Sequence, residues 1–183
     1  MKAKESTIQG CYILEPDIFE DDRGYFFESF NQNNLFDLIG EQVIFVQDNE
    51  SYSKKGVLRG LHFQTGDFAQ AKLVRVTEGL VLDVVLDIRK DSKTYGQHFS
   101  IELSKENKKQ LFIPRGLAHG FVVLSESATF CYKCDNFYNK SSEAGIIYND
   151  PILKIDWKLP ENELIISDKD KELPSFKKTA HDN

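Results

Sequence analysis

Two histidines of this 183-residue chain stand in segments whose residues could carry chemistry. His62 lies in the run GVLRGLHFQ at residues 56–64, and His119 lies in IPRGLAHGF at residues 113–121. An imidazole has an ordinary pKa of ~6.5, so it can accept a proton near neutral pH and act as a general base. A structural role is the commoner explanation for any single histidine, so the surrounding residues must decide what these two can do.

The second segment has a spacing that is typical of the second motif of cupin barrels. Pro114, Gly116 and His119 follow the pattern P-x-G-x-x-H, in which Pro and Gly shape a turn that aims the His inward. Cupins often bind a metal through a His-x-His pair and a following acid, but here Gln64 stands two residues after His62. Because a facial metal site needs about three convergent ligands, the sequence predicts a site without a metal.

The cysteines offer no clear alternative route to metal or redox chemistry. Cys131 and Cys134 form a C-x-x-C pair inside an alternating segment, and positions i and i+3 of a strand face opposite sides. The sequence has no second pair of this kind, and its three cysteines do not make a disulfide framework. We therefore expect buried strand cysteines.

Cations near the two histidines indicate an anionic ligand. Arg23, Arg59 and Lys72 fall in or beside segments that are otherwise apolar. The chain as a whole is acidic, with 23 basic and 29 acidic residues and a net charge of -6, which argues against a nucleic-acid or anionic-membrane partner. A solvated face is the simpler reading for each cation alone, but planar Arg grips phosphate oxygens bidentately, so the three together suit a phosphate-bearing ligand better.

Alternation of apolar and polar residues predicts the elements that must position these side chains. In residues 80–88 every even position is apolar while the odd positions include Asp83 and Asp87, which indicates a strand with one core face. Further strands are predicted at residues 99–104, 110–113, 120–124 and 128–134. Short strands at roughly 10-residue spacing favour an all-β sandwich or barrel.

Turns and a few short helices complete the predicted organisation. Residues 21–24 form a hairpin turn that leads into residues 25–30, and residues 33–39 form a short helix between an Asn start and a Gly40 stop. Ser167 caps a helical turn over residues 167–170, and the polar stretch from Lys177 is expected to fray. No linker divides the chain, so residues 1–183 are expected to form a single domain. The sequence shows no membrane-length apolar run and no secretory signal, so a cytoplasmic location is expected.

Taken in order along the chain, several of these segments resemble the dTDP-4-dehydrorhamnose 3,5-epimerase family. The resemblance runs from about residue 10 to 175 and rests on the motifs DRGYFFE (22–28), QDN (47–49), GVLRGLHFQ (56–64), QAKLV (70–74), IPRGLAHGF (113–121), EAGI (143–146) and NDP (149–151). It implies a cupin-like antiparallel β-barrel or jelly roll that acts without a metal or cofactor, usually as a homodimer. The implied substrate is a dTDP-4-keto-6-deoxyhexose, dTDP-4-dehydro-6-deoxy-D-glucose, and the implied product is dTDP-4-dehydro-L-rhamnose.

The resemblance also implies a role for individual residues. His62 matches the catalytic base, Asp170 the carboxylate that orients it, Tyr132 the proton donor on the opposite ring face, and Lys72 the cation beside the keto oxygen. Tyr138 matches the aromatic residue that stacks on thymine. The remaining positions that match substrate-binding residues are Arg23, Glu28, Gln47, Asn49, Arg59, His119, Glu143 and Lys169.

Two features keep alternatives open. Arg59 and His62 are three residues apart, so a regular strand would aim them in opposite directions unless Gly60 hosts a bulge. The loop at residues 65–68 lacks the Pro that the family more often has there, which leaves substrate detail open. The alternatives are a relative that epimerises only C3 or C5 or serves another deoxysugar pathway, a cupin-type ketoisomerase on the same nucleotide, and a non-catalytic sugar-nucleotide binding barrel.

Overall fold

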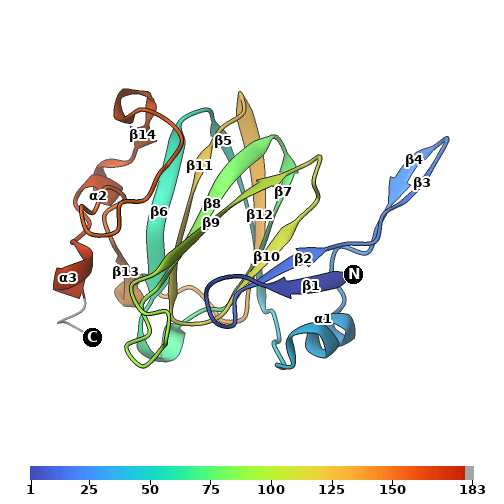
Figure 1. Cartoon of the computed structure of the whole chain (residues 1–183), viewed down its shortest axis with the longest axis horizontal. Coiled ribbons are helices and arrows are strands. Elements are labelled where there is room, and N and C mark those ends of the chain that lie inside the picture. Colours follow the sequence, from blue (N-terminus) through green and yellow to red (C-terminus); the bar gives the residue numbers. More distant parts are fainter. Residues whose placement is uncertain (180–183) are drawn as a thin grey trace.

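The fold consists of two facing β-sheets and a separate hairpin, which confirms the predicted all-β class (Figure 1). A computed structural model of the chain describes residues 1–179. The first sheet has the order β1-β2-β10-β7-β12-β5, with bounds Lys2–Glu5, Tyr12–Glu15, Gln110–Ile113, Lys72–Glu78, Ser127–Cys134 and Gln47–Lys54. The second has the order β13-β6-β11-β8-β9, with bounds Glu143–Gly145, Val57–Gln64, Leu117–Val123, Leu80–Asp87 and His98–Ser104. Neighbouring strands pair antiparallel throughout these sheets, while β14 (Ile165–Ile166) adds a short parallel pairing to β6.

The strands predicted from alternation are present, but the reading of β8 as a strand with one core face was incomplete. Leu82, Val84 and Leu86 pack on one side of β8, while Val81 and Val85 pack on the other. Asp83 and Asp87, which we expected on a polar face, are fully buried. Both faces of the sheet are covered, so successive side chains of β8 enter two different apolar clusters. The alternation therefore does not distinguish a core face from a solvent face.

Three apolar clusters account for this arrangement. One lies between the sheets and includes Val74 and Phe130 from the first and Val85 and Phe121 from the second. The second covers the outer face of the second sheet with the C-terminal segment, through Ile146, Tyr148, Leu153 and Trp157 among others. The third covers the outer face of the first sheet with α1 and the N-terminal region. The C-terminal segment and the N-terminal region with α1 therefore cover the outer faces of the two sheets. The site lies in the space between the sheets.

The short helices occur close to where the sequence predicted them. α1 (Gln32–Ile39) is capped by Asn31, whose side chain accepts from the backbone N–H groups of Asn33 and Asn34, and it ends at Gly40. α2 (Asp168–Lys171) begins at Ser167, whose Oγ accepts the N–H of Asp170 at 3.1 Å. The described residues also form short 3₁₀ helices at Gly66–Phe68, Lys140–Ser142 and Glu161–Glu163.

The stretch that we expected to fray from Lys177 is helical up to Thr179. α3 (Phe176–Thr179) begins where Asp150 Oδ2 accepts the N–H of Phe176 at 2.8 Å, and the Phe176 ring lies 5.4 Å from that of Tyr95. These contacts come from distant parts of the chain, so local polarity did not predict them. The rest of the predicted polar tail, residues 180–183, lies outside the described residues.

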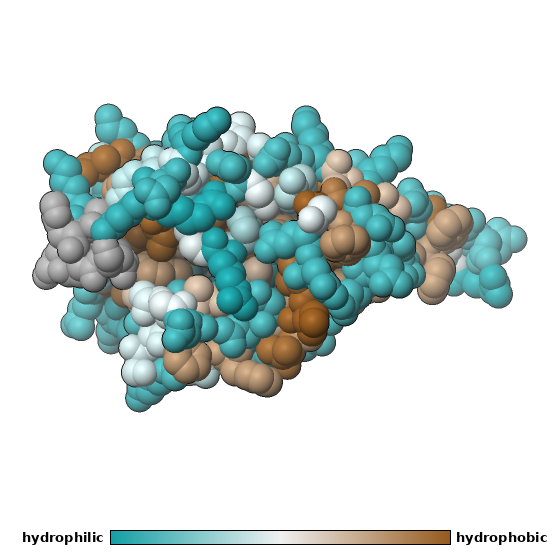
Figure 2. Space-filling model, turned by 90° about the horizontal axis from the view of Figure 1, so that it is seen from below, coloured by the Kyte–Doolittle hydropathy of each residue, from teal (hydrophilic) through white to brown (hydrophobic). Residues whose placement is uncertain are grey.

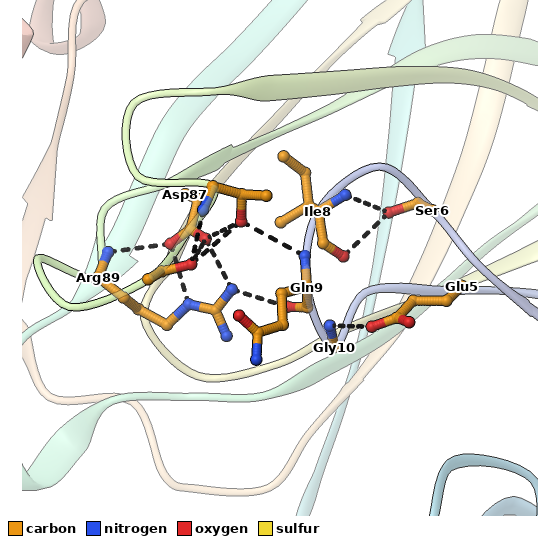
Figure 3. A network of polar contacts seen from close by, with 9 residues as sticks. Glu5, Ser6, Ile8, Gln9, Gly10, Asp87 and Arg89 are labelled. Atoms are coloured by element: carbon orange, nitrogen blue, oxygen red, sulfur yellow. Dashed lines mark hydrogen bonds and ion pairs between the residues drawn. The ribbon is translucent and has the colours of Figure 1, made fainter.

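A buried carboxylate fastens the N-terminal loop to the end of β8 (Figure 3). Asp87 accepts hydrogen bonds from the Arg89 backbone and guanidinium and from the hydroxyls of Ser92 and Thr94, at 2.6 to 3.0 Å. Arg89 donates in turn to the carbonyl of Gln9 at 2.7 Å. Burial alone would raise the pKa of Asp87, but these donors outweigh it and lower the pKa to about 2.

The predicted hairpin projects away from the two sheets (Figure 1). It consists of β3 (Phe19–Asp21) and β4 (Gly24–Phe26), so its second strand is shorter than the predicted segment 25–30. Phe19, Tyr25 and Phe26 are all more than half exposed on it. Figure 2 shows the molecule tapering into this projection, which carries apolar as well as hydrophilic surface. No helix within residues 1–179 is long and apolar enough to cross a membrane.

Candidate active site

A β-bulge in β6 brings Arg59 and His62 to the same side. β6 pairs with β11 at His62–His119 and at Arg59–Phe121, so β6 advances three residues while β11 advances two. Gly60 lies inside this irregularity with φ +121°, a conformation that favours glycine. The two side chains that a regular strand would separate therefore line one cavity. The bulge that the sequence left open at Gly60 is present.

This cavity lies between the sheets and has a volume of about 560 Å³. Arg59, His62 and His119 enter it from the second sheet, and Lys72 and Tyr132 enter it from the first. A smaller cavity of about 300 Å³ adjoins it and shares His62, Lys72 and Tyr132. These shared residues line a central chamber where the two cavities meet.

His62 forms a pair with Asp170 at the wall of the chamber. Its Nε2 lies 2.7 Å from Asp170 Oδ1, and the Asp170 side chain is only 5% exposed while that of His62 is 31% exposed. Asp170 Oδ2 also accepts the N–H of Gly60 at 3.4 Å, so the bulge and the start of α2 fix the carboxylate together. Burial raises the pKa of Asp170, but the hydrogen bond and charge of His62 outweigh it and hold the pKa below its usual value. An ionised carboxylate therefore fixes the imidazole and can stabilise its protonated form.

Tyr132 and Lys72 face His62 from the opposite sheet. Tyr132 lies on β12 and Lys72 at the start of β7, whereas His62 lies on β6. Burial raises the pKa of the Tyr132 phenol, which therefore keeps its proton at neutral pH. Burial also lowers the pKa of the Lys72 ammonium, partly offset by Cys134, Asp83 and Glu143. Within residues 1–179 neither the phenol hydroxyl nor the ammonium makes a hydrogen bond, so both are free to meet a ligand.

A second His–Asp pair, not anticipated from the sequence, lies beside the larger cavity, which His119 lines. His119 Nε2 is 2.8 Å from Asp83 Oδ2, and the side chains are 8% and 0% exposed. The turn at Pro114 and Gly116 does aim His119 inward, although β11 already begins at Leu117 and not at residue 120. From the alternating pattern we expected Asp83 on a polar strand face. The available signal was a carboxylate in an otherwise apolar strand, since a carboxylate can be buried there when a partner pairs with it.

A chain of polar side chains links α2 to the segment that follows β12. Lys169 Nζ lies 2.6 Å from Glu143 Oε2, and the Tyr138 hydroxyl donates to the same oxygen at 2.8 Å. The hydrogen bond to Glu143 is the main cause that raises the pKa of Lys169. Gln47 and Asn49 line the smaller cavity beside Tyr138, and Gln47 Nε2 donates to Asn49 Oδ1 at 2.9 Å.

Two residues that match binding positions lie away from the chamber in this chain. Arg23 sits at the tip of the projecting hairpin, pairs with Asp21, and its side chain is 89% exposed. Glu28 follows the hairpin and accepts hydrogen bonds from Asn31 and Asn34 at the start of α1. The other sequence-predicted positions border the two cavities.

The cysteines and acidic groups complete the inventory of ligating side chains. Cys134 is buried as expected, while Cys131 is only partly buried; Cys11, which precedes β2, is buried as well. Burial raises the pKa of Cys134 to about 11 even beside Lys72. Among residues 1–179, no group of three or more His, Cys, Asp or Glu side chains is placed to hold a metal ion.

The sequence of this chain is similar to those of known proteins over nearly its whole length. A family model described as dTDP-4-dehydrorhamnose 3,5-epimerase matches residues 5–178. The Salmonella typhimurium protein of that name is 56% identical over 160 residues, which cover 86% of this chain and 87% of the relative.

Solved structures agree with the sequence match. The Elizabethkingia anophelis dTDP-4-dehydrorhamnose 3,5-epimerase has a TM-score of 0.95 at 54% identity, covering 98% of each chain. A dTDP-6-deoxy-D-glucose-3,5-epimerase from Legionella pneumophila, solved in complex with dTDP-4-keto-L-rhamnose, has a TM-score of 0.92 at 47% identity. The match covers 96% of this chain and 93% of the Legionella chain.

Proposed function

Because this chain belongs to the dTDP-4-dehydrorhamnose 3,5-epimerase family, we propose that it converts dTDP-4-dehydro-6-deoxy-D-glucose to dTDP-4-dehydro-L-rhamnose. The observation that carries the proposal is the placement of a base and an acid on opposite walls of one chamber. His62, paired with Asp170 of α2, stands on the second sheet, and Tyr132 stands on the first. Inversion at carbon requires that a proton leave one face and arrive at the other, and this arrangement suits it.

The chemistry follows from the 4-keto group of the substrate. The hydrogens on C3 and C5 are acidic because the enolate formed on their removal spreads its charge onto O4. His62 removes the hydrogen, and Asp170 stabilises the imidazolium that results. Lys72, whose ammonium is partly stripped of water, stabilises the charge on O4. Tyr132 then delivers a proton from the other side of the ring.

The nucleotide occupies the residues around the chamber. Arg59, His119 and Lys169 supply positive charge or N–H donors for the diphosphate, since each borders the larger cavity. Tyr138 stacks on thymine, while Gln47, Asn49 and Glu143 contact the sugar-nucleotide from the smaller cavity. This assignment reconciles a net charge of -6 with an anionic substrate, because the cations gather at the site.

The functional unit in this proposal is a homodimer. Arg23 and Glu28 lie on or next to the projecting hairpin, away from the chamber of their own chain. The hairpin also exposes Phe19, Tyr25 and Phe26, which a second copy would cover. Arg23 and Glu28 then serve the chamber of the second copy. The whole chain acts as a single epimerase domain in the cytoplasm.

Proton NMR in heavy water tests the reaction. Incubation with dTDP-4-dehydro-6-deoxy-D-glucose should give deuterium at both C3 and C5 and the L-rhamno product. Deuterium at only one carbon would identify a mono-epimerase, and a product with its carbonyl at C3 would identify a ketoisomerase. Binding without exchange would leave a non-catalytic barrel.

Metal independence is tested separately. We expect full activity after exhaustive EDTA treatment, because Gln64 stands where a second metal-binding His would be needed. Loss of activity that a divalent metal restores would refute this part of the proposal.

A further inference from the structure

We propose that Gln64, together with Gln70, is a positioning residue that holds the Tyr138 loop in the conformation that receives the nucleotide base. The inference rests on the proposed function, in which Tyr138 stacks on thymine. It assigns a task to a buried glutamine that stands two residues after His62 and takes no part in the proton transfers.

The loop begins where β12 ends, at Cys134. Beyond that point, side-chain amides contact successive parts of the backbone. Gln70 Nε2 donates to the carbonyl of Asn136 at 2.8 Å, and Gln64 Oε1 accepts the N–H of Asn139 at 2.9 Å. Between them, Gln47 Oε1 accepts the N–H of Tyr138 at 3.2 Å. Tyr138 is therefore held on both sides along the chain.

Gln64 is the anchor that ties this loop to the catalytic strand. It is the last residue of β6, it is 8% exposed, and it pairs in register with Glu143 of β13. Glu143 in turn accepts the Tyr138 hydroxyl at 2.8 Å. The backbone of the loop is thus held by Gln64, and the ring of Tyr138 is held by Glu143, which pairs with Gln64 at the end of β6.

The opposite side of the loop is fixed by Asn136. Its Nδ2 donates to the carbonyl of Asp67 at 2.8 Å, and its Oδ1 accepts the N–H of Phe137 at 2.9 Å. The loop that contains Gly66–Phe68 is in this way joined to the Tyr138 loop. An amide network of this kind limits the orientations of an exposed aromatic ring, so less freedom is lost when a base stacks on it.

A direct contact between Gln64 and the substrate is the competing explanation, because Gln64 also lines the smaller cavity. The two explanations differ in their dependence on Tyr138. A residue that acts through Tyr138 has no effect once the ring is removed, whereas a direct ligand keeps its effect.

The test is a double-mutant cycle between Gln64→Met and Tyr138→Ala. Met keeps the length of Gln and removes the acceptor, so one buried hydrogen bond is lost. We expect dTDP to bind about three- to tenfold more weakly to Gln64→Met by calorimetry. Affinity for inorganic pyrophosphate should change less than about twofold, because the cations that bind it are untouched. KM should rise with kcat nearly constant, and in the Tyr138→Ala background Gln64→Met should cause no further loss.

Several outcomes would overturn the inference. Additive losses in the double variant would make Gln64 a direct ligand, and an equal loss of pyrophosphate affinity would make its role a general structural one. Unchanged dTDP affinity in Gln64→Met, with a loss in Tyr138→Ala, would refute this inference and leave the proposed function standing. Unchanged affinity in Tyr138→Ala would refute the stacking itself. If Gln64→Met does not fold, Gln70→Met must show the same loss of dTDP affinity, and normal affinity there would refute the inference.

Discussion

Replacing Tyr132 by Phe should separate proton removal from inversion. The ring of Tyr132 packs 6.1 Å from that of Phe130, and its hydroxyl makes no hydrogen bond within residues 1–179. Tyr132→Phe therefore keeps the packing and leaves no buried partner unsatisfied, so the free energy of unfolding should change by less than about 1 kcal/mol. The variant loses the hydroxyl proton that Tyr132 would deliver to the sugar ring of the substrate.

The expected size of the effect follows from the geometry. General acid catalysis contributes ~10²–10⁴ to a rate, and inversion should slow by that factor. His62 and Asp170 remain in place at 2.7 Å, so the enolate still forms and returns a deuteron to its original face. In heavy water, deuterium should appear at C3 and C5 with retained configuration, at a rate within about tenfold of the wild type.

The assay is proton NMR of the substrate with a His62→Ala control. His62→Ala should abolish both wash-in and inversion, because no enolate forms. The side chain of His62 is 31% exposed, so solvent can renew its proton between events. If Tyr132→Phe lost wash-in and inversion to the same extent, this division of labour would be refuted, and Tyr132 would belong to the stabilisation of the enolate.

Three further perturbations test other parts of the site and fold. Arg59→Ala should weaken dTDP binding by ~1.5–3 kcal/mol, the range for a hydrogen bond to a charged group, and calorimetry showing unchanged affinity would remove Arg59 from the site. Lys72→Met keeps the length of the side chain and removes the charge, so kcat should fall ~10²–10³-fold; a change in KM alone would contradict its place beside O4. Asp87 has a folded-state pKa of about 2 against an ordinary value of 3.8, so it stabilises the fold above pH ~4 and loses that contribution as the pH falls towards 2. The difference in unfolding free energy between wild type and Asp87→Asn, from denaturant titrations, should therefore shrink by roughly 2 kcal/mol between pH 6 and pH 2, and a constant difference would contradict the assignment.

Local patterns in the sequence predicted the strands β8 to β12 and the helices α1 and α2. Alternation predicted β10 with the bounds that the structure has, and a strand start one residue late for β9 and β12. An Asn start and a Gly stop predicted α1, and Ser167 was predicted as the cap of α2. Each of these signals comes from residues that are close together in the sequence. Their preference for a strand, a cap or a helix end does not require a partner from a distant part of the chain.

Features that depend on distant partners could not be predicted in the same way. The bulge at Gly60 is defined by the register of β6 against β11, so a glycine alone only permitted it. Asp83 was read as facing solvent because a buried paired carboxylate and an exposed one have the same alternation. The helix at Phe176 depends on Asp150 and Tyr95, and the amides that hold the Tyr138 loop come from β5, β6 and residue 70. The position of Arg23, outside the chamber of its own chain, likewise follows only from the three-dimensional path of the hairpin.

The bulge also sets a limit on how far this barrel can be redesigned. A Cβ at Gly60 would lie 2.5 Å from the Cα of Gly120, and one at Gly120 would lie 2.7 Å from the carbonyl oxygen of Arg59. Each side chain would meet the backbone of the neighbouring strand in the same sheet, so a compensating change at one glycine cannot make room for a substitution at the other. In a mutagenesis library aimed at new sugar nucleotides, positions 60 and 120 should stay glycine in every active clone. Diversity should instead accumulate at side chains such as those of residues 65–68, which lie outside the paired strands.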